Sequence, residues 1–243
     1  MQIILGANGQ IAKTMMMKIL IIVTSVSMCE RGKHKTGLWL SELTHMYDLA
    51  KEAGYNITIA STKGGNVPLD PESLKPMVLD KMTKAYYNDT AFMELLKHTQ
   101  SLSEVQNEQF DVVYLAGGHG TMYDFPNDTT LQNIIKQHYE NKKIVSAVCH
   151  GVSGLLNVKL SNGQYLIKGK TITGFNWFEE SLARRKKEVP FNLEQSLKDR
   201  GADYQKTFIP MTSKVLVDEN LITGQNPFSS KEIAKVVMQQ LKK

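Results

Sequence analysis

The chain has 243 residues, of which 42% are hydrophobic, and a formal net charge of +5. These residues suffice for a packed core, but no apolar run is long enough to span a membrane. The cations are scattered, and the densest group, residues 184–187, lacks interleaved aromatic side chains, so we expect no nucleic-acid partner. Two cysteines exclude a disulfide framework. They predict a free thiol, which fits a reducing cytoplasm.

Residues 1–16 have the pattern of a strand and glycine turn that open a dinucleotide-binding fold. No helix of adequate length separates this turn from the next apolar run, 17–25, which is a better first strand. We therefore expect no bound NAD and predict that residues 1–16 are an N-terminal extension. Residues 17–243 form one α/β domain in this interpretation, because no linker divides them.

Apolar runs and amphipathic segments alternate along that domain. We predict strands at 17–25, 55–61, 111–116, 144–148, 171–173 and 221–224, the last preceded by a hairpin-like pair, and helices at 36–53, 130–139, 178–186, 193–199 and 229–241. The alternation predicts a three-layer α/β sandwich around a mostly parallel sheet. Residues 66–106 are irregular and contain three prolines, and we expect no strong strand there. This length predicts a small helical cap inserted over a site.

The stretch from residue 143 to residue 156 contains the clearest chemical motif. Its β-branched run, 144–148, predicts a buried parallel strand, and Cys149 follows directly. Ala147 and Gly151 flank the cysteine as glycines flank the serine of a G-x-S-x-G elbow. Such a turn strains the cysteine backbone and places the sulfur near the first amides of a helix, which favour a thiolate. We therefore predict a reactive Cys149 rather than a buried structural cysteine.

Sites in parallel α/β sheets lie beyond the carboxyl ends of the strands. This rule brings together three expected segment ends: 117–120, 149–150 and 174–176. Gly117, Gly118 and His119 follow a strand, and glycine amides can approach a substrate closely. With the amide of His150, we expect them to form an oxyanion hole or substrate-binding loop.

His150 is the nearest candidate base, although adjacent residues in an elbow point apart. An acidic partner would hold its ring in the useful tautomer, and either Glu179 or Glu180 could supply it. Glu42 lies near the apolar face of the first predicted helix. A partly desolvated carboxyl there would keep its proton and donate a hydrogen bond to a thiolate, and a charge at the rim of the stripe is an equal alternative. The other histidines are dispersed, and we expect no metal site.

Together these motifs resemble the ThiJ/PfpI superfamily, which is related to class I glutamine amidotransferases. Within it, the heat-shock-chaperone branch with its glutathione-independent glyoxalases (glyoxalase III) is most similar. The resemblance covers residues 17–242 and rests on five motifs in order: Lys35-Thr36-Gly37 with Glu42, Ala116-Gly117-Gly118-His119-Gly120-Thr121, Ala147-Val148-Cys149-His150-Gly151, Ile172-Thr173-Gly174-Phe175 and Leu221-Ile222-Thr223-Gly224-Gln225-Asn226-Pro227. It implies a flavodoxin-like fold, no cofactor and a homodimer.

The resemblance also implies a role for individual residues. Cys149 matches the family nucleophile and His150 its partner, and Glu180 matches the third, acidic member, which favours it over its neighbour. Glu42 matches the glutamate that hydrogen-bonds the cysteine, and Gly118 with His150 would supply oxyanion amides. The implied reaction is that of a D-lactate dehydratase, a lyase, which converts methylglyoxal or a similar 2-oxoaldehyde to a 2-hydroxy acid.

Two other functions stay open on the sequence. The same thiol, base and oxyanion hole suit acyl transfer, as in a cysteine peptidase, an amidase or a deglycase-type hydrolase. In a stress chaperone or redox sensor, Cys149 would instead oxidise to a sulfinate, or apolar surface near residues 66–106 would hold unfolded clients. Residues 176–179 are bulkier and more apolar than the family pattern, which bears on the choice of substrate.

Overall fold

The structure is a computed structural model that describes residues 16–31 and 34–243. The expected N-terminal extension, apart from Met16, lies outside the described residues.

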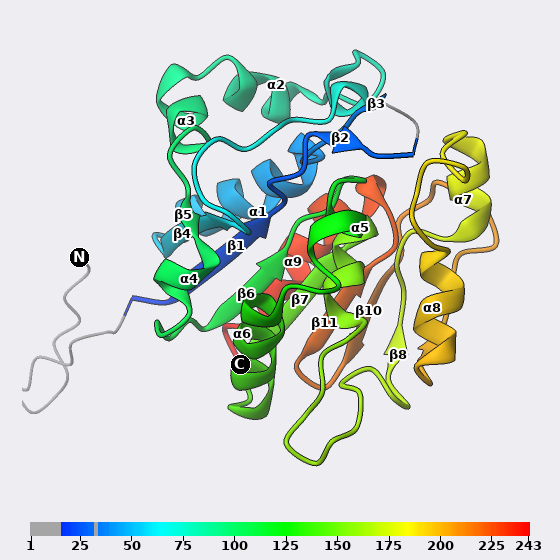
Figure 1. Cartoon of the computed structure of the whole chain (residues 1–243). Helices are drawn as coiled ribbons and strands as arrows, with labels where there is room; N and C mark the ends of the chain where they lie inside the picture. The colour runs from blue at the N-terminus through cyan, green and yellow to red at the C-terminus, as the bar shows by residue number, and fades with distance from the viewer. Residues whose placement is uncertain (1–15, 32–33) are drawn as a thin grey trace, which may run out of the picture.

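A seven-stranded sheet, in the order β10-β11-β7-β6-β1-β4-β5, forms the centre of this part of the chain (Figure 1). Its strands are β1 (Lys18–Val23), β4 (Asn56–Ser61), β5 (Gln100–Ser101), β6 (Val112–Leu115), β7 (Ile144–Val148), β10 (Val215–Asp218) and β11 (Leu221–Gly224). Every neighbouring pair is parallel except β10 and β11, which form an antiparallel hairpin at one edge. The predicted sandwich around a mostly parallel sheet is confirmed.

Helices cover both faces of the sheet (Figure 1). In chain order the helices, with η for 3₁₀-helices, are α1 (Leu40–Glu52), η1 (Pro71–Leu74), α2 (Lys81–Tyr87), α3 (Thr90–Leu95), α4 (Leu102–Val105), α5 (Thr121–Asp124), α6 (Thr129–Glu140), η2 (Cys149–Leu155), α7 (Trp177–Leu182), α8 (Leu193–Asp199), η3 (Pro227–Ser229) and α9 (Ser230–Gln240). No helix among the described residues is long and apolar enough to cross a membrane.

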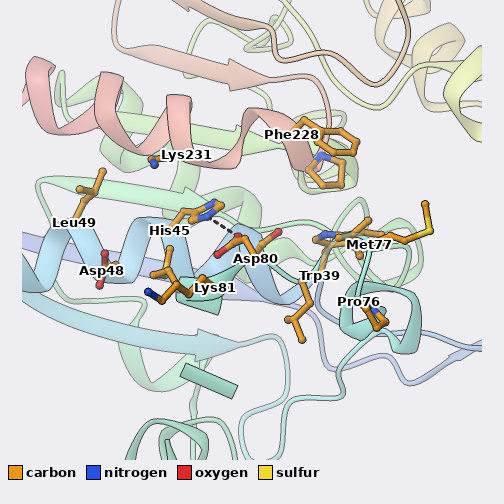
Figure 2. A pocket seen from close by; sticks show the side chains of 15 residues that line it. Trp39, His45, Asp48, Leu49, Pro76, Met77, Asp80, Lys81, Phe228 and Lys231 are labelled. Carbon is orange, nitrogen blue, oxygen red and sulfur yellow. Dashed lines mark ion pairs between the residues drawn. The ribbon is translucent and has the colours of Figure 1, made fainter. Parts of the chain in front are cut away.

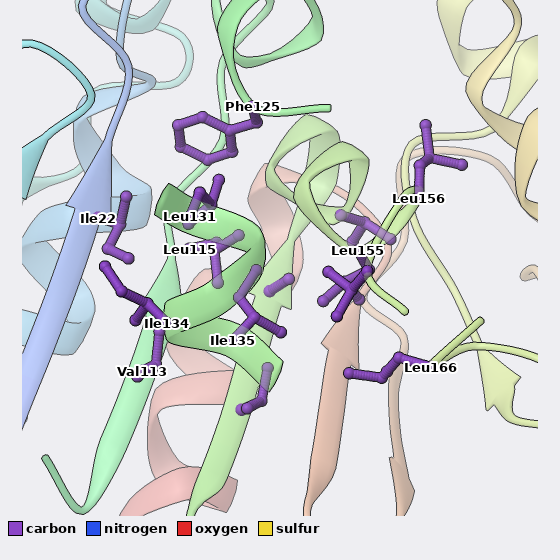
Figure 3. Packing of buried hydrophobic residues seen from close by; sticks show 14 of the residues in the cluster. Ile22, Val113, Leu115, Phe125, Leu131, Ile134, Ile135, Leu155, Leu156 and Leu166 are labelled. Atoms are coloured by element: carbon purple, nitrogen blue, oxygen red, sulfur yellow. The ribbon is translucent and has the colours of Figure 1, made fainter. Parts of the chain in front are cut away.

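Successive residues of a strand point to opposite faces, so the central strands supply two separate cores. Leu20 and Ile22 of β1 belong to the core beneath α6 and η2, which Figure 3 shows. Ile19 and Ile21 belong to the other core, beneath α1 and α9. Both faces of the central strands are therefore buried, which explains why their sequences are continuous apolar runs rather than alternating ones.

Residues 66–106 contain η1, α2, α3 and α4 and the short edge strand β5, which pairs with β4. The strand is a small difference from the expected irregular segment. The insertion packs against α1, where the hydroxyl oxygens of Thr44 and Thr83 lie 2.9 Å apart. Its action as a cap stays a prediction.

The expected strand at residues 171–173 is not part of the main sheet. It is β8 (Thr171–Ile172), which pairs in parallel with β9 (Asp203–Tyr204) in a separate two-stranded sheet. The hairpin strand β10 occupies the position beside β11. A second two-stranded sheet joins β2 (Met28–Cys29) and β3 (His34–Lys35).

Candidate active site

Cys149 occupies the turn between β7 and η2, at the carboxyl end of the central strand. Its φ is +57°, a left-handed conformation that is strained for a residue with a side chain. The strained elbow expected from the sequence is therefore present. The segment that follows is a 3₁₀-helix rather than a longer α-helix. It packs tightly, because a Cβ on Gly154 would lie 2.5 Å from Leu115 Cδ2.

A chain of hydrogen bonds links the sulfur to an acidic residue. The Sγ atom of Cys149 lies 3.3 Å from His150 Nδ1, so the adjacent side chains do meet. On the other side of the same ring, Nε2 lies 2.8 Å from Glu180 Oε2. A carboxylate can only accept hydrogen bonds, so this contact places the proton on Nε2 and leaves the Nδ1 lone pair facing the thiol. The three side chains have the geometry of a nucleophile, a base and an orienting acid.

Glu180 also binds a second imidazole. His119 Nε2 lies 2.8 Å from Glu180 Oε1, and the ring centroids of His119 and His150 are 4.0 Å apart. Burial alone would raise the pKa of Glu180, but the two imidazoles that face it outweigh this effect and lower that pKa. Glu180 is therefore ionised at neutral pH.

Glu179, the other open candidate for the acidic partner, faces away from His150. Its Oε1 accepts hydrogen bonds from the Met211 amide and from the side chains of Gln225 and Asn226. It joins α7 to the loop before β10 and to the turn after β11. The contacts of Glu179 are those of a structural clamp, and Glu180 is the glutamate that contacts the histidines.

Glu42 lies in the first turn of α1, completely buried, with its carboxyl group beside Cys149. The Gly117 amide donates to Glu42 Oε2 at 2.6 Å, and Oε1 has no partner among the described residues. Burial raises the pKa of Glu42 to about 8, against the opposing effect of the Gly117 amide. Glu42 is therefore mostly protonated at neutral pH and can donate a hydrogen bond to the sulfur.

The expected resting thiolate is wrong. Burial raises the pKa of Cys149 well above its usual value, any negative charge on Glu42 raises it further, and the His150 amide only partly opposes this. Burial and the neighbouring His119 lower the pKa of His150 to about 4. At neutral pH the pair is a neutral thiol beside a neutral imidazole. The sequence-based argument rested on the helix amides and on a hydrogen bond from Glu42, whereas Cys149 is only 1% exposed.

The glycine loop after β6 lies against these side chains. Its Gly117 amide donates to Glu42 Oε2 in this structure, and the expected part of Gly117 in an oxyanion hole or substrate-binding loop stays a prediction. Gly118 has φ +110°, and a Cβ there would lie 2.1 Å from the Gly37 carbonyl oxygen, so only glycine fits. The amides of Gly118 and His150 stay the predicted oxyanion donors.

The roles of two side chains next to His150 were not predicted from the sequence. His119 was expected to act through its backbone, but its side chain is bound to Glu180. The Phe175 ring lies 4.4 Å from the His150 ring, centroid to centroid, and restricts its movement. The Phe175 contact depends on how the chain returns after β8, which no local sequence pattern records.

Metal-binding side chains gather at one place in the described part of the chain. Donor atoms of His119, His150 and Glu180 all lie within 4.8 Å of one another. These three side chains already satisfy one another through two hydrogen bonds of 2.8 Å, so their arrangement does not require a metal ion.

A pocket of about 690 Å³ lies on the other side of α1, between this helix, residues 76–82 and the start of α9 (Figure 2). Within it, His45 Nε2 lies 3.0 Å from Asp80 Oδ2. Cys149 and His150 are not among the residues that line it. The reactive group is thus closed: Glu42, Cys149, His150 and Glu180 are each at most 3% exposed, and His119 is 7% exposed.

Curated proteins of known name are similar to this chain over most of its length. Glyoxalase 3 of Candida albicans is 32% identical over 232 residues, which cover 92% of this chain and 98% of that protein. The glutathione-independent glyoxalase hsp3101 of Schizosaccharomyces pombe is 31% identical, with 86% and 90% of the two chains covered.

Solved structures show the same likeness. The Rapid Encystment Protein 24 KDa of Francisella tularensis matches with a TM-score of 0.88 and 38% identity, covering 93% of this chain and 99% of that one. The glyoxalase III structure from Candida albicans matches with a TM-score of 0.84 and 30% identity, covering 92% and 96%. The model of the DJ-1/PfpI family matches residues 35–240. The chain therefore belongs to the DJ-1/PfpI family.

Proposed function

We propose that this protein is a glutathione-independent glyoxalase that converts methylglyoxal, or a similar small 2-oxoaldehyde, to a 2-hydroxy acid. The observation that supports it most is the closed group of a thiol, an imidazole whose unprotonated nitrogen faces that thiol at 3.3 Å, and a carboxylate that holds the imidazole. The names of the relatives in Candida albicans and Schizosaccharomyces pombe support the same activity.

The first step is addition of the sulfur to the aldehyde. His150 Nδ1 takes the thiol proton while Cys149 Sγ bonds to the aldehyde carbon, which gives a hemithioacetal. The protonated carboxyl of Glu42 and the amides of Gly118 and His150 stabilise negative charge, on the sulfur before attack and on the oxygen afterwards. The His150 imidazolium then gives its proton to that oxygen, which completes the neutral hemithioacetal and restores the base. Because the resting thiol is neutral, the base is needed for every turnover.

The second step moves hydrogen between two carbons. His150 takes the proton from the former aldehyde carbon, which gives an enediol, and returns a proton to the neighbouring carbon. The product is a thioester of a 2-hydroxy acid, and water hydrolyses it to release D-lactate and the thiol. The sum is methylglyoxal plus water to lactate, with no external oxidant or reductant. Glu180 holds the ring through both steps and stabilises the imidazolium when it forms.

The closed site also bears on the competing hydrolase. A peptide substrate must pass its main chain over the nucleophile, whereas Cys149 is 1% exposed. A three-carbon aldehyde needs much less space. The burial of the sulfur therefore favours a small substrate over a cysteine peptidase.

Lactate formation from methylglyoxal without glutathione tests the proposal. We expect D-lactate from the wild type and from a Cys29→Ser control, and none from Cys149→Ser. Equal rates from wild type and Cys149→Ser would contradict the proposal. Release of ammonia from glutamine or of amine from a glycated amino acid, with no lactate from 2-oxoaldehydes, would favour the hydrolase.

A chaperone activity is a second candidate, because Met77 in the 66–106 insertion is 95% exposed. Protection of a heated client protein by Cys149→Ser but not by Met77→Gln would support it, and no protection by the wild type would exclude it.

We further propose a homodimer in the cytoplasm. The family supports the dimer, and the two free cysteines, Cys29 and Cys149, support a reducing compartment. Light scattering coupled to size-exclusion chromatography tests the dimer, and a monomeric mass at micromolar concentration would contradict it.

A further inference from the structure

His119 contacts the proposed catalytic group but has no part in the steps above. Its Nε2 donates to Glu180 Oε1 at 2.8 Å while His150 Nε2 donates to Oε2 of the same carboxylate. His119 is 7% exposed. Both oxygens of Glu180 are thus used, one by each imidazole.

Two hydrogen bonds constrain a carboxylate more than one does. A carboxylate anchored at one oxygen can turn about the bond to its methylene group, whereas anchoring both oxygens fixes its plane. Without His119, Oε1 of Glu180 would be buried and would lose the one hydrogen bond that the structure gives it in the described part of the chain. Leaving a buried acceptor without a hydrogen bond is unfavourable, so Glu180 would turn toward another donor. His150 would then lose part of its orientation.

The loop that presents His119 is itself held firmly. A Cβ on Gly118 would lie 2.1 Å from the Gly37 carbonyl oxygen, and a Cβ on Gly120 would lie 2.8 Å from the Val26 carbonyl oxygen. The Thr121 hydroxyl donates to the Gly118 carbonyl at 2.8 Å. The backbone on both sides of His119 therefore packs without spare room, and its imidazole is a fixed anchor.

We propose that His119 is a positioning residue, which fixes the Glu180 carboxylate and through it the orientation and tautomer of His150. Its effect on activity rests on the proposed glyoxalase function, but its effect on the thiol of Cys149 does not. Orienting partners of this kind contribute about 10–100-fold to activity where they have been removed.

The charged neighbours of His119 determine how its removal would change the pH dependence of activity. Glu180 of α7 faces both rings, and Glu42 of α1 faces the sulfur. Burial raises the pKa of Asp70, just before η1, and the nearby His119 partly opposes that rise. His119 lowers the pKa of His150, whereas the Glu180 carboxylate, which both rings contact, raises the pKa of His150. Removing the imidazole therefore raises the pKa of His150.

Two amide variants of equal polarity test the proposal. Gln places its amide nitrogen near the position of an imidazole Nε2, so His119→Gln keeps a donor for Glu180, whereas the shorter His119→Asn does not reach it. We expect His119→Asn to lower kcat about 10–100-fold with KM little changed and to move the acid limb of the pH profile upward. His119→Gln should restore most of the activity. His98→Gln, at an exposed histidine that pairs with Glu94, is the matched surface control.

Alkylation of Cys149 by iodoacetamide at pH 7, followed by mass spectrometry, provides a readout without substrate. We expect the rate to fall in His119→Asn and to stay near wild type in His119→Gln and His98→Gln. Equal alkylation rates in Asn and Gln variants that both fold would overturn the proposal. If the wild type makes no lactate, the glyoxalase function fails, and the alkylation rates still decide the role of His119.

Discussion

Replacing Glu180 by Gln is the sharpest test of how Cys149 becomes reactive. The carboxylate accepts from His150 Nε2 and from His119 Nε2, each at 2.8 Å. A Gln side chain has one acceptor oxygen and one donor nitrogen, so it cannot accept from both rings. If its NH₂ group faces His150, that ring must keep a lone pair on Nε2. Its proton then lies on Nδ1, facing the sulfur, and the thiol has no acceptor.

The size of the effect follows from the loss of a general base. Such a base contributes about 10²–10⁴-fold to rate, which corresponds to about 2.7–5.4 kcal/mol at 1.36 kcal/mol per tenfold. We expect Glu180→Gln to lose this much in kcat, with a smaller loss in Cys149 alkylation. The variant also loses one charge-assisted hydrogen bond, worth about 1.5–3 kcal/mol. For a chain of this size, Tm should fall by about 3–12 °C.

Glu179→Gln is a matched control at the adjacent, equally buried position. Glu179 accepts from Met211, Gln225 and Asn226 and has no hydrogen bond to either histidine, so this variant should lose stability. Its alkylation rate should not fall, because the charge of Glu179 raises the pKa of Cys149. Lactate formation, iodoacetamide alkylation at pH 7 and thermal unfolding are measured on all three proteins. Equal alkylation and lactate rates in Glu180→Gln and the wild type would refute the proposed orienting role.

Four further predictions concern the other groups at the site. The profile of kcat/KM should fall below about pH 4, where His150 gains a proton, and above about pH 8, where Glu42 loses one beside Cys149. Profiles without these limbs would contradict both assignments. Glu42→Gln keeps a neutral hydrogen-bond donor, so it should remove the fall of kcat/KM above about pH 8. It should change the rate at pH 7 by less than about tenfold, the value of one hydrogen bond. A larger loss would show that the carboxylic acid itself is required. Because the pKa of Glu42 is raised in the folded state, the contribution of Glu42 to stability is complete below pH 4.5 and is lost as the pH rises through about 8. The unfolding free energy of the wild type should therefore fall over that range relative to Glu42→Gln, and parallel curves would contradict the burial argument. Gly117→Ala places a Cβ 2.6 Å from Glu42 Oε2 and 2.8 Å from the Val148 carbonyl oxygen. The variant should therefore lose about 1–3 kcal/mol of unfolding free energy, measured by chemical denaturation. An unchanged denaturation midpoint would contradict the close packing.

The fold was predictable because the continuous apolar sequences of the central strands indicate directly that these strands are buried. The β-branched run at residues 144–148 is β7 with the same bounds, and the spacing of apolar residues placed α6 within one residue at each end. The place of β8 outside the main sheet was not predictable. It depends on β10 taking the edge beside β11, a competition between distant segments.

The site was predictable where its chemistry is local. Cys149 follows from the strand, the small flanking residues and the turn, and its φ of +57° agrees with a strained elbow. The residues alone left Glu179 and Glu180 equal, because consecutive helical positions differ only in direction. That direction is set by α7, where the Asn176 side chain accepts from the amides of Phe178 and Glu179 and fixes the start of the helix.

The protonation state of Cys149 was not predictable in the same way. The helix amides argued for a thiolate, but the burial of the sulfur and of Glu42 depends on how α1 packs against the loop after β6. Glu42 lies 107 positions before Cys149 in the chain, so the effect of its carboxyl group on the pKa of the thiol can be judged only once the fold brings the two together.

The tautomer of His150 tests the central claim most directly. Nitrogen-15 NMR of the imidazole rings at pH 7, with His150 assigned from a His150→Gln variant, distinguishes the two neutral tautomers and the imidazolium. The hydrogen bond to Glu180 predicts a neutral ring with its proton on Nε2 and a bare Nδ1 beside Cys149. A proton on Nδ1 in the resting protein would leave the thiol without a base and would contradict the account.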